Sequence, residues 1–146
     1  SLLYKIHRNK RTVKEVNFDP PFKDKLYLVY LNKKKNSLEE IKKFKNIKNQ
    51  NMYIEEISNI TSQIISCNNQ IEFNSLIKEH EDIISKLTAR ETIKNILFSD
   101  FKGEIKSLGA WGGDFILASS SELTTDYFRN KGYNDIFKYN ELIMNQ

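Results

Sequence analysis

Apolar and polar residues along the chain first follow a strand pattern and then recur at helical spacing. Residues 2–7 and 12–18 read as two short strands around a polar turn, and the Pro-Pro pair at 20–21 ends any ladder that they form. Residues 26–31 (LYLVYL) are a near-continuous apolar run of β-favouring residues. This run predicts a strand that is buried on both faces and lies centrally in a sheet.

The next part of the chain predicts three amphipathic helices. The first starts at Ser37, whose hydroxyl can cap free helix amides while the Glu40 side chain reaches back to the cap. In each helix the apolar residues recur every three or four positions and build one buried face. These residues are Leu38, Ile41 and Phe44 in the first helix, Ile54, Ile57, Ile60 and Ile64 in the second, and Phe73, Leu76, Ile77, Ile83, Ile84 and Leu87 in the third.

The remaining residues predict shorter elements that complete the fold. We expect a short helix over 91–97, strands over 104–108 and 115–118, a helix that starts at 119–121 and stops at Gly132, and a last strand over 135–139. Apart from the N-terminal hairpin, the order is strand, helices, strand, strand, helix, strand. This order predicts one α+β domain over residues 1–146, a ferredoxin-like split βαβ sheet with extra helices in the first crossover, plus an N-terminal β-hairpin.

The composition agrees with a single folded domain. The 146 residues are 39% hydrophobic and 29% charged, which excludes disorder. The single cysteine, Cys67, has no disulfide partner within the chain, which favours a reducing compartment and excludes a cysteine-based metal site. No stretch has the roughly 20 apolar residues of a membrane span, and the N-terminus lacks the pattern of a signal peptide. We therefore expect a cytoplasmic protein without a membrane partner.

Positive charge is concentrated in the first part of the chain. Residues 1–50 hold 14 Lys and Arg against 5 Asp and Glu, and the remainder holds 9 against 14. A basic end fits nucleic acid or a phosphorylated small molecule, and it also fits a solvated lysine face. Ferredoxin-like RNA-binding domains stack bases on a strand that contains Lys/Arg-Gly-Phe, and no such strand occurs here. Nucleic acid is therefore not the expected partner.

The glycines are confined to the last third of the chain. None precedes Gly103, and Gly109, Gly112 and Gly113 fall within five consecutive residues between two predicted strands. Small residues let the backbone turn sharply, so that its free amides can face an anion such as phosphate. In the alternative interpretation the glycines only supply the positive φ angles of a hairpin connection. Trp111, between these glycines, either covers a ligand or packs on the core.

Residues 106–115 (KSLGAWGGDF) resemble the third conserved motif of the GHMP kinase superfamily, the group of galactokinase, homoserine kinase, mevalonate kinase and phosphomevalonate kinase. That motif runs basic-x-Thr/Ser-Gly-Ala-Gly-x-Gly-Gly. The residues that fit it are Gly109, Ala110, Gly112 and Gly113. Leu108 replaces the hydroxyl residue, Trp111 replaces a glycine, and Asp114 stands where a small residue is usual.

Residues 22–31 and 35–37 add to the resemblance, because together with the glycine segment they are similar to a subgroup of uncharacterised bacterial members of the superfamily. The resemblance therefore covers essentially the whole chain. It implies the C-terminal, substrate-side domain of an ATP-dependent, mevalonate kinase-like enzyme that transfers the γ-phosphate of ATP to an alcohol or phosphate acceptor. ATP and Mg²⁺ would bind the full-length protein. The nucleotide-binding N-terminal half would be the missing partner of this domain, so the domain alone would be inactive and bind neither.

The same resemblance implies roles for two segments. The first would close on the transferred phosphate and offer backbone amides to developing negative charge. Its residues are Ser107, Gly109, Ala110, Trp111, Gly112 and Gly113. Lys35, Asn36 and Ser37 would lie near the acceptor, although a capping box with solvated lysines also explains them. No catalytic base is identified. Asp114 is the one candidate for Mg²⁺, or it points away as the first residue of a strand.

Two further features read as structural. His80 lies on the apolar stripe of the third helix without a His or Cys at ligand spacing, which predicts a hydrogen-bonded core histidine. Glu79, Glu81 and Asp82 predict a solvated acidic face on the opposite side of that helix. The alternative function is a small-ligand-binding or regulatory domain that uses the same sheet and glycine turn without catalysis.

Overall fold

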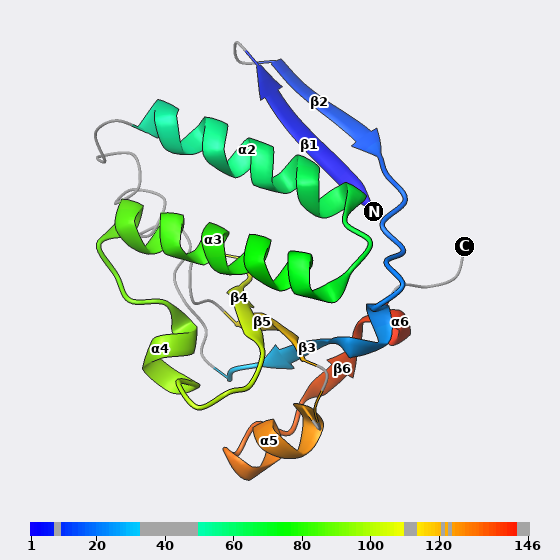
Figure 1. The fold of residues 1–146 in the computed structure, drawn as a ribbon, viewed down its shortest axis with the longest axis vertical. Coiled ribbons are helices and arrows are strands. Elements are labelled where there is room, and N and C mark those ends of the chain that lie inside the picture. Colours follow the sequence, from blue (N-terminus) through cyan, green and yellow to red (C-terminus); the bar gives the residue numbers. More distant parts are fainter. Residues whose placement is uncertain (8–9, 33–49, 110–113, 121, 123, 143–146) are drawn as a thin grey trace.

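The computed structural model describes residues 1–7, 10–32, 50–109, 114–120, 122 and 124–142, and Figure 1 draws them as a ribbon. The predicted helix that starts at Ser37 lies outside these residues, together with its apolar face. No helix in the described part of the chain is both long enough and apolar enough to cross a membrane.

A four-stranded antiparallel sheet forms the centre of the molecule. Its strands lie in the order β4 (Glu104–Ser107), β5 (Phe115–Ser119), β3 (Leu26–Tyr30) and β6 (Ile136–Lys138). The register pairs Val29 of β3 with Ile116 on one side and with Ile136 on the other. The apolar run that forms β3 is therefore an interior strand, as its pattern predicted. The strand order is that of the ferredoxin-like fold, which confirms the predicted fold class.

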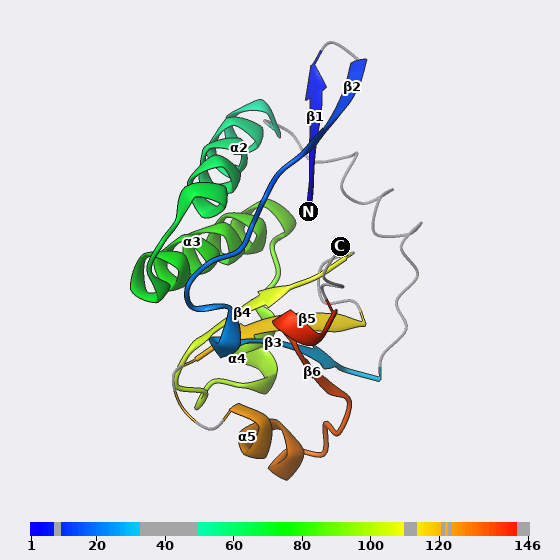
Figure 2. The ribbon, with the colours of Figure 1, turned by 90° about the vertical axis from the view of Figure 1, so that its right-hand side faces the viewer.

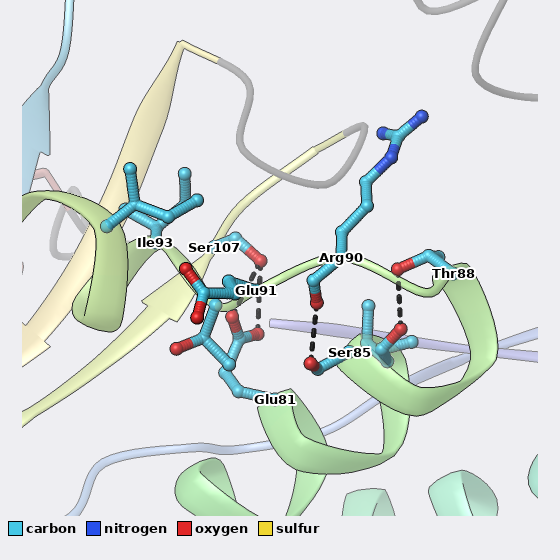
Figure 3. A pocket seen from close by; sticks show the side chains of 10 residues that line it. Glu81, Ser85, Thr88, Arg90, Glu91, Ile93 and Ser107 are labelled. Carbon is cyan, nitrogen blue, oxygen red and sulfur yellow. Dashed lines mark hydrogen bonds between the residues drawn. The ribbon is translucent and has the colours of Figure 1, made fainter.

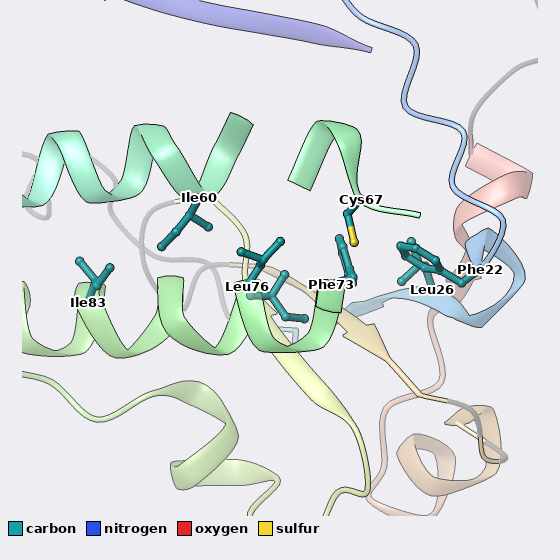
Figure 4. Packing of buried hydrophobic residues seen from close by; sticks show 8 residues of the cluster. Phe22, Leu26, Ile60, Cys67, Phe73, Leu76 and Ile83 are labelled. Carbon is teal, nitrogen blue, oxygen red and sulfur yellow. The ribbon is translucent and has the colours of Figure 1, made fainter. Parts of the chain in front are cut away.

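Two long helices occupy the first crossover, α2 (Gln50–Ser66) and α3 (Gln70–Thr88). Helix α3 begins where it does because the Asn69 side chain accepts a hydrogen bond from the Glu72 amide at 2.8 Å. The apolar faces of α2 and α3 meet each other, and α3 lies against the sheet at β4, as Figures 1 and 4 show. This first core consists of Phe22, Leu26, Ile60, Cys67, Phe73, Leu76, Ile77 and Ile83.

A second core lies on the other face of the sheet. Because successive strand residues point to opposite faces, Val29 and Ile116 face this side while Leu26 faces the first core. Helices α4 (Ile93–Leu97) and α5 (Thr124–Asn130) cover it. Phe98 packs edge-on against Phe128, with ring centroids 5.1 Å apart. The sheet is therefore the shared middle layer between two helical layers.

Helix α5 differs from its prediction at one end and agrees with it at the other. It begins at Thr124 rather than at 119–121, because Ser119 still pairs in the sheet and the Ser120 hydroxyl bonds to the Lys102 carbonyl at 2.8 Å. It stops at Gly132, whose φ of 87° is left-handed. The Tyr133 amide then donates to the Phe128 carbonyl at 3.0 Å, which closes the helix end as predicted.

The last predicted strand is too long at both ends. Strand β6 covers only Ile136–Lys138, and the short helix α6 (Tyr139–Leu142) follows at once. The Glu141 carboxylate accepts a hydrogen bond from the Lys138 amide at 3.1 Å, which favours a helical turn over a continued strand. A short 3₁₀ turn, η1 (Lys23–Lys25), leads into β3 at the same side of the molecule.

The N-terminal hairpin is a separate two-stranded sheet. Strand β1 (Leu2–His7) pairs antiparallel with β2 (Lys10–Glu15), and Figure 2 shows this pair extending away from the central sheet. The second strand was predicted over 12–18. It is shifted toward the turn because β1 can pair only as far as its own ends, Leu2 with Glu15 and His7 with Lys10.

Candidate functional site

Three strand ends meet at one edge of the central sheet. The Leu31 amide, just beyond β3, donates to the Asp114 carbonyl at 2.7 Å, and the Leu108 amide, just beyond β4, donates to the Phe115 carbonyl at 3.0 Å. Tyr30 is paired with Phe115 in the register. The last residues before 33–49 and before 110–113 are thereby held beside the start of β5. The two segments singled out from the sequence therefore leave the sheet at the same end.

Both exits from the sheet use a left-handed backbone. Asn32 has a φ of 54° and Gly109 has a φ of 71°. Glycine carries no Cβ and asparagine tolerates this region better than most residues, so each residue type fits its position. Among the described residues, no atom lies within 4 Å of where the Cβ of Gly109 would stand. These angles turn the chain sharply as it leaves the sheet.

The structure describes only part of the predicted phosphate segment. Ser107 and Gly109 are described, whereas Ala110, Trp111, Gly112 and Gly113 lie outside the described residues. The substrate-side candidates Lys35, Asn36 and Ser37 lie outside them as well.

Asp114 is held by its backbone at this edge. Its carbonyl continues the β3–β5 ladder toward Leu31, and the residue is half-buried. Among the described residues, no group of three or more His, Cys, Asp and Glu side chains could hold a metal ion.

A buried carboxylate, Glu81, lies behind the end of β4. The Ser107 hydroxyl donates to both Glu81 oxygens, at 3.1 Å to Oε1 and 2.9 Å to Oε2. The Lys106 Nζ lies 3.5 Å from Glu81 Oε1 and 3.1 Å from His80 Nδ1. Helix α3 thus contributes two side chains and strand β4 the other two. We call these four residues the Glu81 cluster.

The burial of Glu81 corrects the prediction of a solvated acidic face. The residue is 5% exposed, whereas Glu79 is exposed and Asp82 is half-buried. Glu81 lies four residues after Ile77 and three before Ile84, and both of these are core residues. This spacing places it on the apolar stripe itself. The signal was present in the sequence, but a run of acidic residues suggested one common exposed face.

The charges in the Glu81 cluster support one another. Burial opposes ionisation of Glu81, but the His80 ring, the Lys106 ammonium and the Ser107 hydroxyl outweigh it, so the pKa of Glu81 lies below its ordinary value. Burial lowers the pKa of Lys106, and the Glu81 carboxylate opposes this effect. Because unpaired charges are costly in such a place, each of these two groups depends on the other.

His80 is hydrogen-bonded, as predicted, and lies at the edge of the core with 15% of its side chain exposed. Its Nδ1 lies 3.1 Å from Lys106 Nζ, within hydrogen-bond distance. The same nitrogen lies 3.7 Å from Glu81 Oε1. His80 therefore lies beside both charged groups of the Glu81 cluster.

A cavity of about 360 Å³ opens beside the Glu81 cluster. Figure 3 shows Glu81 and Ser107 at one side of it, and Ser85, Thr88 and Arg90 around the end of α3. Its other lining residues are Ile84, Glu91, Thr92, Ile93 and Ile96. The Ser85 hydroxyl donates to the Arg90 carbonyl at 2.5 Å, and the Thr88 hydroxyl donates to the Ile84 carbonyl at 2.7 Å. Both hydroxyl protons are therefore used within the protein.

A second cavity, of about 520 Å³, lies at the far end of the sheet beside α5. At its rim the Tyr127 hydroxyl donates to Asp100 Oδ1 at 2.6 Å, and Lys131 Nζ lies 2.9 Å from the same oxygen. The hydrogen bonds from Lys131 and then from Tyr127 lower the pKa of Asp100 to about 2. Burial and then the bond to Asp100 raise the pKa of Tyr127 to about 12. This network joins α5 to the loop after α4.

The strand order of the central sheet, with helices on both of its faces, defines a ferredoxin-like domain. Three solved structures share the fold, and all three are mevalonate kinases. The L. major enzyme in complex with R-mevalonate matches with a TM-score of 0.65 and 14% identity, over 90% of this chain and 43% of that chain. The Methanococcus jannaschii enzyme matches with a TM-score of 0.61 and 20% identity, over 92% of this chain and 44% of that chain. A further mevalonate kinase gives a TM-score of 0.66 and 20% identity, over 92% and 45%.

At these identities the likeness establishes the fold, and it confirms the fold expected from the resemblance to GHMP kinases. The chain spans less than half the length of the mevalonate kinases that it matches. No protein-family model matches the sequence, and no curated protein matches it.

Proposed function

We propose that residues 1–146 form the C-terminal, substrate-side domain of an ATP-dependent small-molecule kinase of the GHMP type. The full-length enzyme transfers the γ-phosphate of ATP to an alcohol or phosphate acceptor, and mevalonate is the first acceptor to test. The observation that carries the proposal is the shared fold with less than half of each mevalonate kinase chain, combined with the glycine motif at the sheet edge.

The proposal gives the two segments at the sheet edge complementary tasks. Backbone amides in the segment 109–113 face the transferred phosphate, where preorganised donors stabilise developing negative charge. Lys35, Asn36 and Ser37 lie toward the acceptor. Support comes from the hydrogen bonds that hold Leu31 beside Asp114, because both segments depart from that place.

Ser107 has a supporting task in this proposal. Its hydroxyl already donates to Glu81, so the phosphate contacts are assigned to the amides that follow it rather than to the hydroxyl. Glu81 is then a positioning residue, which fixes the end of β4 from which the glycine segment departs. ATP and Mg²⁺ belong to the full-length protein, the nucleotide phosphates being held mainly by the preceding half. A cytoplasmic location is part of the same proposal.

The upstream coding sequence provides the first test. A Gly-Ser-rich segment at the start of a helix, encoded roughly one domain (about 100–200 residues) before Ser1, is the expected finding. An upstream sequence without such a segment contradicts the kinase assignment.

Phosphotransfer by the full-length chain provides the second test. We expect ATP-dependent phosphorylation by the full-length protein and none by residues 1–146 alone. Gly112→Val abolishes the activity while the circular dichroism spectrum is retained, because a branched side chain obstructs the approach of the backbone to phosphate. Asn134→Val, at an exposed loop position, is the matched control and retains activity. Turnover by residues 1–146 alone overturns the domain assignment, and full activity of Gly112→Val reduces the segment to a plain hairpin connection.

The second candidate function is a non-catalytic small-ligand-binding or regulatory domain. The departures from the motif at Leu108, Trp111 and Asp114 favour it, as does the cavity of about 360 Å³ beside the Glu81 cluster. A full-length protein that binds ATP or an acceptor without transferring phosphate supports this candidate over the kinase.

A further inference from the structure

The β1–β2 hairpin has one mainly apolar face and one mainly basic face. The register places Leu2 opposite Glu15, Tyr4 opposite Val13 and Ile6 opposite Arg11. Residues two apart, and residues paired across the two strands, share a face. One face carries Leu2, Tyr4, Ile6 and Val13 together with Arg11 and Glu15, and we call its four apolar residues the apolar hairpin face. The other face carries Leu3, Lys5, His7, Lys10, Thr12 and Lys14. Such alternation is typical of a sheet with one buried and one solvated face.

The apolar hairpin face is nevertheless exposed in residues 1–146. Leu2 is 58% exposed, Tyr4 60%, Ile6 74% and Val13 52%. All six residues of β2 are exposed. A two-stranded hairpin is at best marginally stable in water without a surface to pack on, and clustered exposed apolar side chains mark a contact surface. The pattern is therefore that of a sheet whose covering layer is not among the described residues.

Phe18, which follows the hairpin, joins its base to the domain. Phe18 stacks on Phe73 of the first core, with centroids 6.3 Å apart, and its carbonyl accepts a hydrogen bond from the Tyr139 hydroxyl at 3.1 Å. Figures 1 and 2 show both strands reaching from this region toward one end of the molecule. The strands thus stand in a fixed relation to the domain at their base while their apolar face stays open.

We infer that the apolar hairpin face packs against the preceding domain of the full-length chain. This inference rests on the proposed function, in which the domain is one part of a longer kinase. The mevalonate kinases with this fold are more than twice as long as their matched regions. A domain that precedes Ser1 is joined directly to β1, so it is held at high effective concentration beside this face.

The size of the face favours a tethered occupant over a second copy. A stable dimer buries about 800 Å² on each partner, which is far more than four side chains on a two-stranded sheet provide. A covalently joined domain needs less area, because the chain connection has already met most of the entropic cost of association. The opposite face carries the three lysines, and its one apolar residue, Leu3, is already half-buried, so the exposed apolar side chains are those on the side toward the partner.

The test uses the full-length protein and two double variants. Tyr4→Thr/Ile6→Thr makes the apolar hairpin face polar and keeps β-favouring residues. Lys5→Thr/Lys14→Thr makes the same kind of change on the opposite face. Thermal unfolding and limited proteolysis follow the coupling of the two domains. We expect the first variant to separate one unfolding transition into two and to speed cleavage near residues 1–18 by about tenfold. The second variant behaves as the unchanged protein.

Each outcome decides the inference. If both variants unfold and are cleaved as the unchanged protein does, the inference is wrong. If residues 1–146 dimerise in light scattering, and Tyr4→Thr/Ile6→Thr abolishes the dimer without affecting the full-length protein, a second copy is the occupant and the inference is also wrong. A full-length protein that transfers no phosphate, yet loses domain coupling in the first variant, contradicts the proposed function and leaves the inference supported.

Discussion

Substitution of Glu81 tests whether the Glu81 cluster stabilises the domain. Glu81→Gln removes the charge that faces the half-buried Lys106 while leaving an amide of the same shape. Because this breaks a largely buried pair, we expect the free energy of unfolding at neutral pH to fall by about 2 kcal/mol. Urea unfolding of residues 1–146 measures it. The control is Glu79→Gln, at an exposed position on the same helix. Equal stability of the two variants would contradict a structural role for the cluster.

The same carboxylate gives the stability a defined pH dependence. The pKa of Glu81 is lower in the folded protein than in the unfolded chain, where it is about 4.3. Between the two values the unfolded chain binds more protons, so stability rises with pH. The contribution is complete above the unfolded pKa and is lost as the pH falls through the folded pKa. Glu81→Gln therefore flattens the acid side of the stability profile, measured by unfolding between pH 3 and 7.

Asp100 offers a direct titration at a single residue. The Lys131 ammonium and then the Tyr127 hydroxyl hold the pKa of Asp100 at about 2. Lys131→Met removes the first of these donors, so we expect the pKa of Asp100 to rise toward its ordinary value of 3.8. The carboxyl carbon resonance in an NMR titration reports the change. An unchanged resonance midpoint would mean that Lys131 does not bond to Asp100 in solution.

At the scale of elements, the loop from α4 to β4 passes very close to the end of β5. A Cβ added at Gly103 would collide with the Ser119 carbonyl oxygen and would lie 2.8 Å from both the Phe101 ring and Ser120 Cβ. Gly103→Ala therefore forces the loop and the strand apart, at a cost of about 2–3 kcal/mol. The added Cβ of Gly132→Ala meets no atom of the described residues within 4 Å, but the residue keeps a φ of 87°, which costs about 1 kcal/mol. Thermal unfolding ranks the two variants, and the reverse order would contradict the close approach.

Element boundaries depended on contacts that lie far apart in the sequence. The length of the N-terminal strands followed from their mutual register rather than from the residue pattern of either strand. Helix α5 started late because Ser119 and Ser120 bond to Leu26, Lys25 and Lys102. The helix stop at Gly132 was predictable, since it depends on one residue and the turn before it. A helix end that depends on hydrogen bonds between neighbouring residues was therefore predictable from the sequence. The ends of the N-terminal strands and the start of α5 depend on pairing between distant residues, so only the folded structure determined them.

At the scale of the whole molecule, the two cores share one sheet. Leu26 and Val29 lie on the same strand, β3, and their side chains belong to opposite cores. We expect Phe73→Leu in the first core and Phe98→Leu in the second each to lower the stability by about 1 kcal/mol. Both variants shift one common transition, because neither core can unfold without exposing the sheet. Separate transitions in urea, followed by circular dichroism and tryptophan fluorescence, would contradict this coupling.

The sequence by itself determined the order of elements and hence the fold. The spacing of apolar residues, every two positions in a strand and every three to four in a helix, is a local property of the sequence. A near-continuous apolar run such as LYLVYL is buried on both faces, which favours a central position in the sheet. The candidate glycine segment was also visible, because its composition is unusual wherever it lies. Its role, and those of Lys35, Asn36 and Ser37, stay predictions.

Only the tertiary structure decided which polar residues are buried together. Glu81 and Ser107 are 26 residues apart, and nothing local to either one indicates that the end of β4 meets α3 there. In the same way, the hairpin pattern required a buried face, but only the folded chain revealed that none of its described elements provides one. Local periodicity sets the face on which a residue lies. Burial depends on what packs against that face, and chain segments distant in sequence determine it.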